Sequence, residues 1–174
     1  MTVTLRTARL LLRPPQQGDF EAWATLDADE VATRFIGGVS DRAASWQGLA
    51  TAVGMWSLRG CGLFSVLEAE TGRWVGRVGP WAPEGALGTE VGWAIDRSAW
   101  GLGYATEAAE AAVDWAFETL GWSEVIHCIA PQNTASIAVA KRLGSHRLRD
   151  DLENGKPVEV YGQARAAWRA SHTG

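Results

Sequence analysis

The sequence has little clustered positive charge of the kind that binds nucleic acid. It has 174 residues and a net charge of −4, and only two of its sixteen cationic residues, Lys141 and Lys156, are lysines. Contact with a phosphate backbone needs Lys and Arg gathered on one surface, and no basic stripe is present. We therefore expect no nucleic-acid partner.

Long apolar runs and cysteines are also scarce. No apolar stretch approaches the roughly 20 residues that a membrane helix needs. Charges interrupt the N-terminal segment MTVTLRTARLLLRPP, which does not resemble a signal peptide. The two cysteines, Cys61 and Cys128, are expected to be free thiols. These features predict a cytoplasmic protein with no membrane partner.

Tryptophan, in contrast, is abundant, with ten residues of this type. Each joins a large apolar ring to one N–H donor, so a surplus can fill a core, line a binding cleft or form a subunit contact. The chain length fits one domain, residues 1–174, with a substantial core. A homodimer is one partnership that this composition allows.

Hydrophobic periodicity and turn residues predict an alternation of strands and helices. Helices are expected from Asp19, as the cap, through Leu26, from Ser40 to residue 56, after Gly103, and over 133–143. Strands are expected over 9–14, 63–70, 73–81, 89–95 and 123–130, with one hairpin at Thr71-Gly72 and a closing hairpin around Asn154-Gly155. This order predicts an α/β (α+β) fold with a mixed sheet and helices on both faces.

The segment SAWGLGYATEAAEAAVDWAFETLGW, Ser98 to Trp122, places two glycines directly before a long helix. The first N–H groups of a helix have no acceptor inside it, and the helix dipole is positive at that end. Glycines at 101 and 103 leave the approach open, which is typical of a phosphate site, although a plain tight turn has the same pattern.

Two common phosphate motifs do not fit this turn. A dinucleotide fingerprint needs a third glycine where Thr106 stands, and a P-loop needs a Gly-Lys-Ser/Thr sequence that is absent. The turn also lacks lysine and metal-binding carboxylates. It suits a pyrophosphate that is held by backbone amides.

The segment EVGWAIDRSAWGLGYATEA resembles the central signature of the GCN5-related N-acetyltransferases (GNAT), in particular their RimJ/RimL-like branch. TARLLLRP, FIGG and PQNTASIAVAKRLG resemble further segments of that branch, in the same order. The general family motif has Gln or Arg where this chain has Ser98. The resemblance implies a sheet of about six to seven strands, mostly antiparallel, in which one parallel pair is splayed apart.

This resemblance also implies a co-substrate and its contacts. Acetyl-CoA would bind with its pyrophosphate on the amides of the turn and its pantetheine arm beside one strand, and no metal is implied. The implied coenzyme-binding residues are Trp93, Ala94, Ile95, Gly101, Leu102, Gly103, Tyr104, Ala105, Thr106 and Asn133.

The acceptor in this reading is a primary amine, either a protein N-terminus or a small molecule. Glu90 is the candidate base, and Ser136 is the candidate acid for the leaving thiolate, with Tyr104 and Tyr161 as alternatives. The aromatic residues Phe35, Trp56 and Trp81 are candidates for the acceptor pocket.

Two other functions remain open at this point. A protein that keeps the coenzyme site could act without catalysis, as an acyl-CoA sensor or assembly module. A nucleotide-dependent oxidoreductase is disfavoured by Thr106. Acetyl transfer to an amine, by direct attack in a ternary complex, is the function that the sequence favours.

Overall fold

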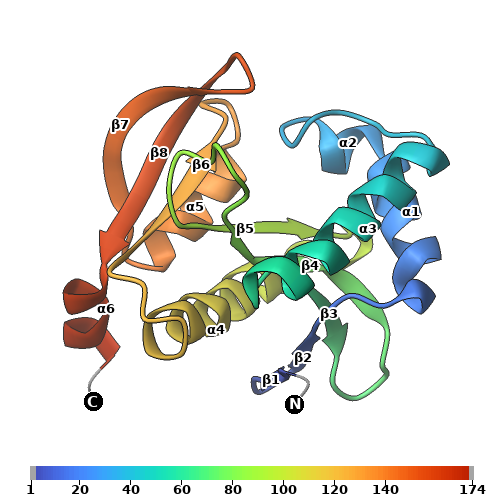
Figure 1. Ribbon diagram of the computed structural model, residues 1–174, viewed down its shortest axis with the longest axis horizontal. Coiled ribbons are helices and arrows are strands. Elements are labelled where there is room, and N and C mark those ends of the chain that lie inside the picture. The colour runs from blue at the N-terminus through green and yellow to red at the C-terminus, as the bar shows by residue number, and fades with distance from the viewer. Residues whose placement is uncertain (1–2, 173–174) are drawn as a thin grey trace.

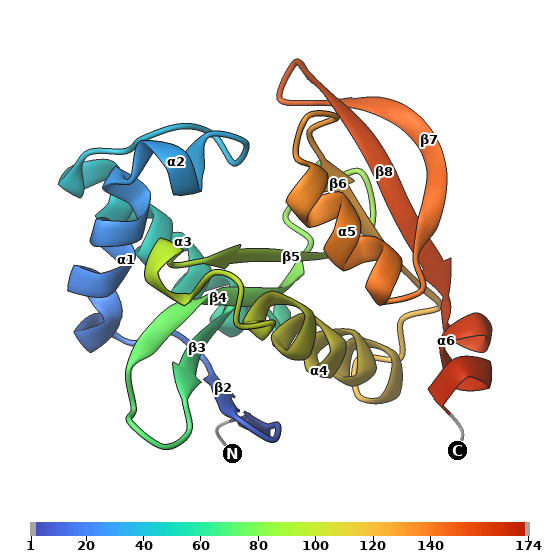
Figure 2. The same ribbon diagram turned by 180° about the vertical axis from the view of Figure 1, so that it is seen from behind.

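One mixed sheet runs through the whole protein, which is described here from a computed structural model that covers residues 3–172. The chain forms the strands and helices in the order β1 (Leu5–Arg6), β2 (Leu10–Arg13), α1 (Phe20–Ala28), α2 (Glu30–Thr33), α3 (Arg42–Arg59), β3 (Phe64–Glu68), β4 (Trp74–Trp81), β5 (Glu90–Ile95), α4 (Tyr104–Glu118), β6 (Glu124–Ile129), α5 (Thr134–Arg142), β7 (His146–Glu153), β8 (Lys156–Ala164) and α6 (Arg165–His172). Figure 1 shows these elements from one side and Figure 2 from the other.

The strand order in the sheet is β1-β2-β3-β4-β5-β6-β8-β7. Every neighbouring pair is antiparallel except β5 and β6. The predicted mixed and mostly antiparallel sheet is therefore confirmed. Its strand number is eight rather than six to seven, because Leu5–Arg6 adds a short edge strand. Two residues are too few to leave a period-2 pattern in the sequence.

Alternation along the strands divides the side chains between two faces of the sheet. Phe64 and Val66 of β3 join the large core cluster that contains the alanines of α4, whereas Ser65 between them faces α1. The α4 residues at this contact are small and fully buried, namely Ala108, Ala109, Ala112 and Ala116. Small side chains let the helix lie close to the sheet, with α5 beside it (Figure 2).

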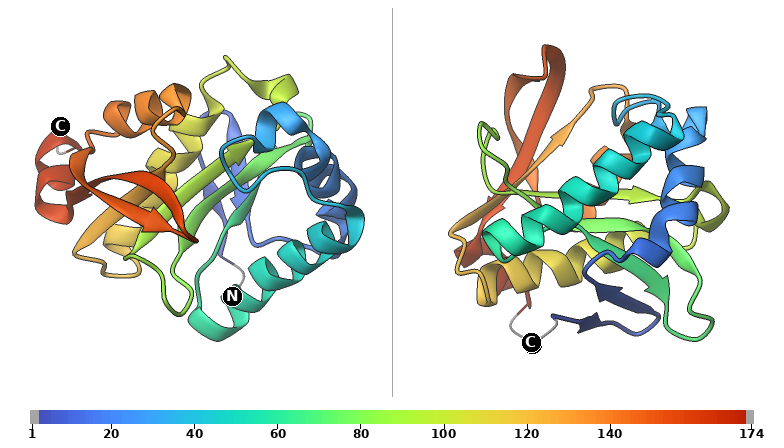
Figure 3. Two further views of the ribbon diagram at one scale, coloured as in Figure 1. Left: turned by 90° about the horizontal axis from the view of Figure 1, so that it is seen from above. Right: turned by 45° about the vertical axis from the view of Figure 1, so that its right-hand side comes forward.

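The opposite face is covered by α1 and α3, which cross it as Figure 3 shows. Here Trp23, Leu49 and Ala52 form a second buried cluster with Trp74 of β4. The indole N–H of Trp74 donates to the Ser65 hydroxyl at 3.1 Å, which satisfies a polar group beneath the helices.

Several local expectations are corrected by long-range contacts. Asp19 makes no side-chain cap to α1, because its carboxylate pairs with Arg13 at 2.7 Å and accepts a hydrogen bond from Ser65 at 2.7 Å. The α3 helix begins at Arg42 rather than at Ser40, because the carboxylate of Asp41 accepts the Ala44 N–H and caps it there. The C-terminal helix α6 was not predicted.

Both predicted tight turns are present. Gly72 has φ = 71° between β3 and β4, and Asn154 and Gly155 have φ = 49° and 74° between β7 and β8. Cys61 and Cys128 are free thiols, as predicted. No helix among residues 3–172 has the length and apolar character needed to span a membrane.

Candidate active site

The splayed pair is β5 and β6, which meet in one residue pair and then separate (Figures 1 and 2). The Ile126 N–H donates to the Thr89 carbonyl at 3.0 Å. One residue beyond the paired residues Glu90 and Ile126, the carbonyl oxygen of Val91 is 2.7 Å from Nδ1 of His127. Because a carbonyl only accepts hydrogen bonds, Nδ1 must carry the ring proton. Burial lowers the pKa of His127 to about 4, so a neutral side chain bridges the opening.

A cavity of about 480 Å³ opens at this splay. The turn after α2 and the β7–β8 hairpin rise on its two sides, and β5 forms its floor (Figures 1 and 3). Its lining residues include Phe35, Ile36, Arg77, Trp81, Glu90, Gly92, Trp93, Ala94, His127, Cys128, Asn133, Ser136, Glu153 and Lys156. The cavity therefore brings together seven of the fifteen candidate residues from the sequence, and residues 101–106 do not line it.

Glu90 is the first residue of β5 and lies in this cavity. One of its carboxylate oxygens accepts the Cys128 N–H at 3.1 Å, at the position where the ladder between the strands has ended. Burial raises the pKa of Glu90 to about 7, and the nearby charge of Glu153 acts in the same direction. A carboxylate with this pKa can accept a proton near neutral pH.

Glu153 is a cavity residue that the sequence did not single out. It is the last residue of β7, and its carboxylate, that of Glu90 and the Cys128 thiol have ligand atoms within 4.8 Å of one another. Burial raises the pKa of Glu153 and, with the charge of Glu90, raises the pKa of Cys128 to about 12. Two carboxylates at this distance favour a cation between them. The expectation that no metal is bound stays a prediction.

Ser136 lies on α5, on the other side of the splay. Its Oγ accepts a hydrogen bond from the Trp93 indole N–H at 3.1 Å, which leaves the serine hydroxyl proton available for donation. Asn133 caps α5 by accepting the Ser136 N–H at 3.2 Å, and both residues line the cavity. Asn133 is therefore a helix cap in any case, and its contact with coenzyme stays a prediction.

The two tyrosines that were alternative acids lie elsewhere. The Tyr104 hydroxyl donates to Glu68 at 3.2 Å, and the Tyr161 hydroxyl donates to Glu159 at 3.0 Å. Neither tyrosine lines the cavity. Burial and the acidic partner raise the pKa of both hydroxyls. The geometry favours Ser136 over both of them.

The aromatic candidates separate into two groups. Phe35 and Trp81 line the cavity as expected. Trp56 does not line the cavity, so the structure does not place it in the expected acceptor pocket. Its indole N–H donates to the Leu63 carbonyl at 2.9 Å, and its ring packs 4.9 Å from that of Phe64, in the main core.

The connection from β5 to α4 ends in residues 101–106, which include the first residues of α4 and which we call the α4 turn. Gly101 and Gly103 have φ = 76° and 80°, a region that L side chains rarely adopt. Gly103 is the N-cap and makes no side-chain cap, and the first recorded helical bond runs from the Glu107 N–H to its carbonyl. A Cβ atom at Gly101 would have no neighbour within 4 Å, so the turn is open to an anion.

The splayed sheet, the helix start with open amides and the carboxylate of Glu90 at the splay agree with the arrangement that the sequence resemblance implies. The family profile of the acetyltransferase (GNAT) domain matches residues 9–146. The chain belongs to this family, and it is an N-acetyltransferase by class.

Individual relatives agree with this assignment. A crystal structure of an acetyltransferase from Agrobacterium tumefaciens str. C58 is 33% identical, covers 94% of this chain and 95% of its own, and has a TM-score of 0.86. The protein YkkB of Bacillus subtilis is 35% identical over 59% of this chain, and the match spans 60% of YkkB. RimL, a ribosomal L7/L12 alpha-N-protein acetyltransferase solved with coenzyme A, shares the fold at 16% identity, with a TM-score of 0.79 and coverage of 95% and 99%.

Proposed function

We propose that the chain transfers an acetyl group from acetyl-CoA to a primary amine by direct attack in a ternary complex. The observation that carries this proposal is Glu90, whose partly buried carboxylate has a pKa of about 7 and faces a cavity at the splay of β5 and β6. The site also holds a hydroxyl, on Ser136, whose proton is available. We further propose that residues 1–174 act as one cytoplasmic domain.

The coenzyme would reach the cavity from the α4 turn. Its diphosphate would accept hydrogen bonds from the open amides of residues 101–106 at the positive end of the α4 dipole. Its pantetheine arm would follow Trp93–Ile95, whose neighbouring strand has separated, and would pass Asn133. Coenzyme A in the RimL structure, which has the same fold, supports this reading.

The chemistry requires two proton movements. The acceptor arrives as an ammonium ion, and Glu90 takes one proton so that the neutral amine can attack the thioester carbonyl. A C–N bond forms and the C–S bond breaks. The nitrogen then loses its second proton to the Ser136 hydroxyl oxygen, while that hydroxyl gives its own proton to the departing sulfur. The products are an amide and free coenzyme A.

The cavity also indicates what the acceptor carries. The carboxylates of Glu90 and Glu153 favour a positively charged amine, and the rings of Phe35 and Trp81 add apolar and cation-binding surface. Protein N-termini and small amines both meet these requirements. We propose a primary ammonium group at this position, from either source.

Release of the coenzyme A thiol tests this function directly. Purified protein with acetyl-CoA should release thiol when peptides with free N-termini or small primary amines are added. Glu90→Gln should abolish release, whereas Glu124→Gln, a change at an exposed position on β6, should not. Coenzyme binding without release on any amine would instead identify a non-catalytic sensor. Absence of both would contradict the proposal.

A further inference from the structure

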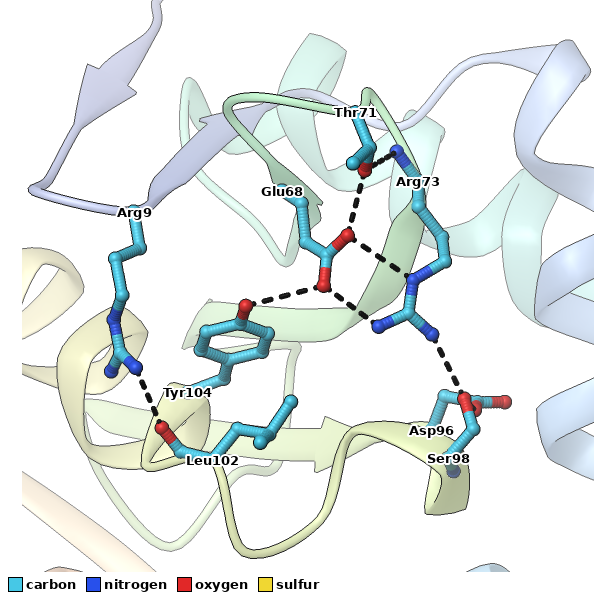
Figure 4. A network of polar contacts seen from close by, with 8 residues as sticks. All are labelled: Arg9, Glu68, Thr71, Arg73, Asp96, Ser98, Leu102 and Tyr104. Atoms are coloured by element: carbon cyan, nitrogen blue, oxygen red, sulfur yellow. Dashed lines mark hydrogen bonds and ion pairs between the residues drawn. The ribbon is translucent and has the colours of Figure 1, made fainter.

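Two arginine–glutamate pairs contact the start of α4. Three of their four residues, Arg9, Glu68 and Arg73, come from distant parts of the chain. Figure 4 shows the first pair, Glu68 and Arg73, on the β3–β4 hairpin. Arg73 contacts both oxygens of the Glu68 carboxylate, at 2.7 Å and 3.2 Å, and the Thr71 hydroxyl donates to the same carboxylate at 2.6 Å. These hydrogen bonds lower the pKa of Glu68 to about 2, so the pair is charged at any working pH.

This first pair reaches both ends of the connection between β5 and α4. Nη1 of Arg73 donates to the Ser98 hydroxyl at 3.0 Å, before the glycines. The Tyr104 hydroxyl donates to Glu68 at 3.2 Å, after them. One ion pair on a hairpin therefore fixes two points that lie six residues apart in sequence, on either side of Gly101 and Gly103 (Figure 4).

The second pair, Arg9 and Glu107, fixes the middle of the turn. Nη1 of Arg9 donates to the Leu102 carbonyl at 2.9 Å, while Nη2 lies 2.6 Å from Glu107. The Arg9 guanidinium also lies 4.8 Å from the centre of the Tyr104 ring. The Thr7 hydroxyl donates to Glu107 at 2.6 Å, which ties the β1–β2 turn to α4.

A turn with two glycines has more conformations to lose on binding than the same turn with other residues at those two positions. An anion is held by such a turn only when several N–H groups converge, and ordering them during binding weakens affinity. We propose that the Glu68–Arg73 and Arg9–Glu107 pairs are positioning devices that hold the α4 turn in its diphosphate-binding shape before the coenzyme arrives. This inference rests on the proposed coenzyme site, but the order of the free turn can be measured without any coenzyme.

Amide hydrogen exchange in the free protein is the first measurement. Arg73→Gln should raise the exchange rates of the two hydrogen-bonded amides that flank the turn, those of Trp100 and Glu107, by about tenfold, the change expected from loss of one charge-assisted contact. Arg42→Gln is the matched control, because Arg42 donates two similar hydrogen bonds to Glu21 and so joins α3 to α1, away from the connection between β5 and α4 in sequence. Unchanged exchange in Arg73→Gln, or an equal rise in both variants, would overturn the proposal.

Coenzyme titration separates a positioning role from direct contact. Arg73→Gln and Ser98→Ala should each raise the dissociation constant of coenzyme A by about tenfold, and the double variant should be no weaker than either. Additive effects would mean that Arg73 does not act through Ser98, which would overturn the inference.

A truncated donor completes the test. S-acetyl-N-acetylcysteamine has the thioester but no diphosphate, so its turnover should be the same in the wild type and in Arg73→Gln. An equal loss with both donors would indicate a general structural defect and would overturn the positioning role. If the wild type took up no coenzyme A, the proposed function would fail, while the exchange rates would still decide whether the pairs order the turn.

Discussion

Replacing Glu90 by Gln should remove activity and, at alkaline pH, make the fold more stable. The carboxylate is partly buried in the cavity with a pKa of about 7, against an ordinary value of 4.5. A raised carboxyl pKa means that the folded state favours the protonated form. Its stabilising contribution is complete below pH 4.5 and is lost as the pH rises through 7. At pH 8.5 Glu90 is ionised in the folded wild type, and its charge has a lower free energy in the unfolded chain, so it destabilises the fold.

The size of this effect follows from the two pKa values. Their difference corresponds to about 3 kcal/mol of unfolding free energy at pH 8.5. Glutamine removes the charge but keeps an oxygen that can accept the Cys128 N–H. Glu90→Gln should accordingly gain up to about 3 kcal/mol at pH 8.5 and nothing at pH 4.

Urea unfolding at the two pH values measures this difference, with Glu124→Gln as the control at an exposed position. In the same samples, kcat/KM of the wild type should rise with pH through about 7, because the base must be ionised. If Glu90→Gln were destabilised equally at both pH values, burial would not raise the pKa of the Glu90 carboxyl, and its role as a base near neutral pH would be refuted.

Four further substitutions separate the parts of the site. Ser136→Ala should lower kcat by about 10²-fold without changing the dissociation constant of coenzyme A, as measured by steady-state kinetics and calorimetry. Gly92→Val should raise the KM of the amine at least about tenfold at unchanged coenzyme affinity, because its side chain would extend into the cavity beside Glu90. Trp56→Ala should lower the free energy of unfolding by about 3 kcal/mol in a chemical denaturation experiment, because Trp56 packs in the core. Trp81→Ala should instead change the KM of the amine, because Trp81 lines the cavity. The reverse pattern would contradict the separation of these two tryptophans.

Local sequence patterns predicted the elements whose signals are contained within a few residues. The two glycine turns at Gly72 and Gly155 marked their hairpins, and the alanine and acid spacing after Gly103 marked α4. The place of Glu90 at the start of β5 also followed from the strand pattern. The family resemblance supplied the splay between β5 and β6.

The remaining features depend on contacts between distant residues. Asp19 looked like a helix cap, but Arg13 and Ser65 take its carboxylate. Glu153 could not be identified, because only the pairing of β8 with β6 brings the β7–β8 hairpin to Glu90. Tryptophan composition alone could not separate Trp56 in the core from a cavity residue, since both bury most of their surface.

The central claim is that the amides of the α4 turn hold the diphosphate of acetyl-CoA and place the thioester beside Glu90. A crystal structure of the protein with coenzyme A tests it most directly. We expect diphosphate oxygens within hydrogen-bonding distance of the backbone nitrogens of residues 101–106, and the thiol in the cavity between β5 and β6. A diphosphate bound at any other place, with the turn empty, would contradict the account.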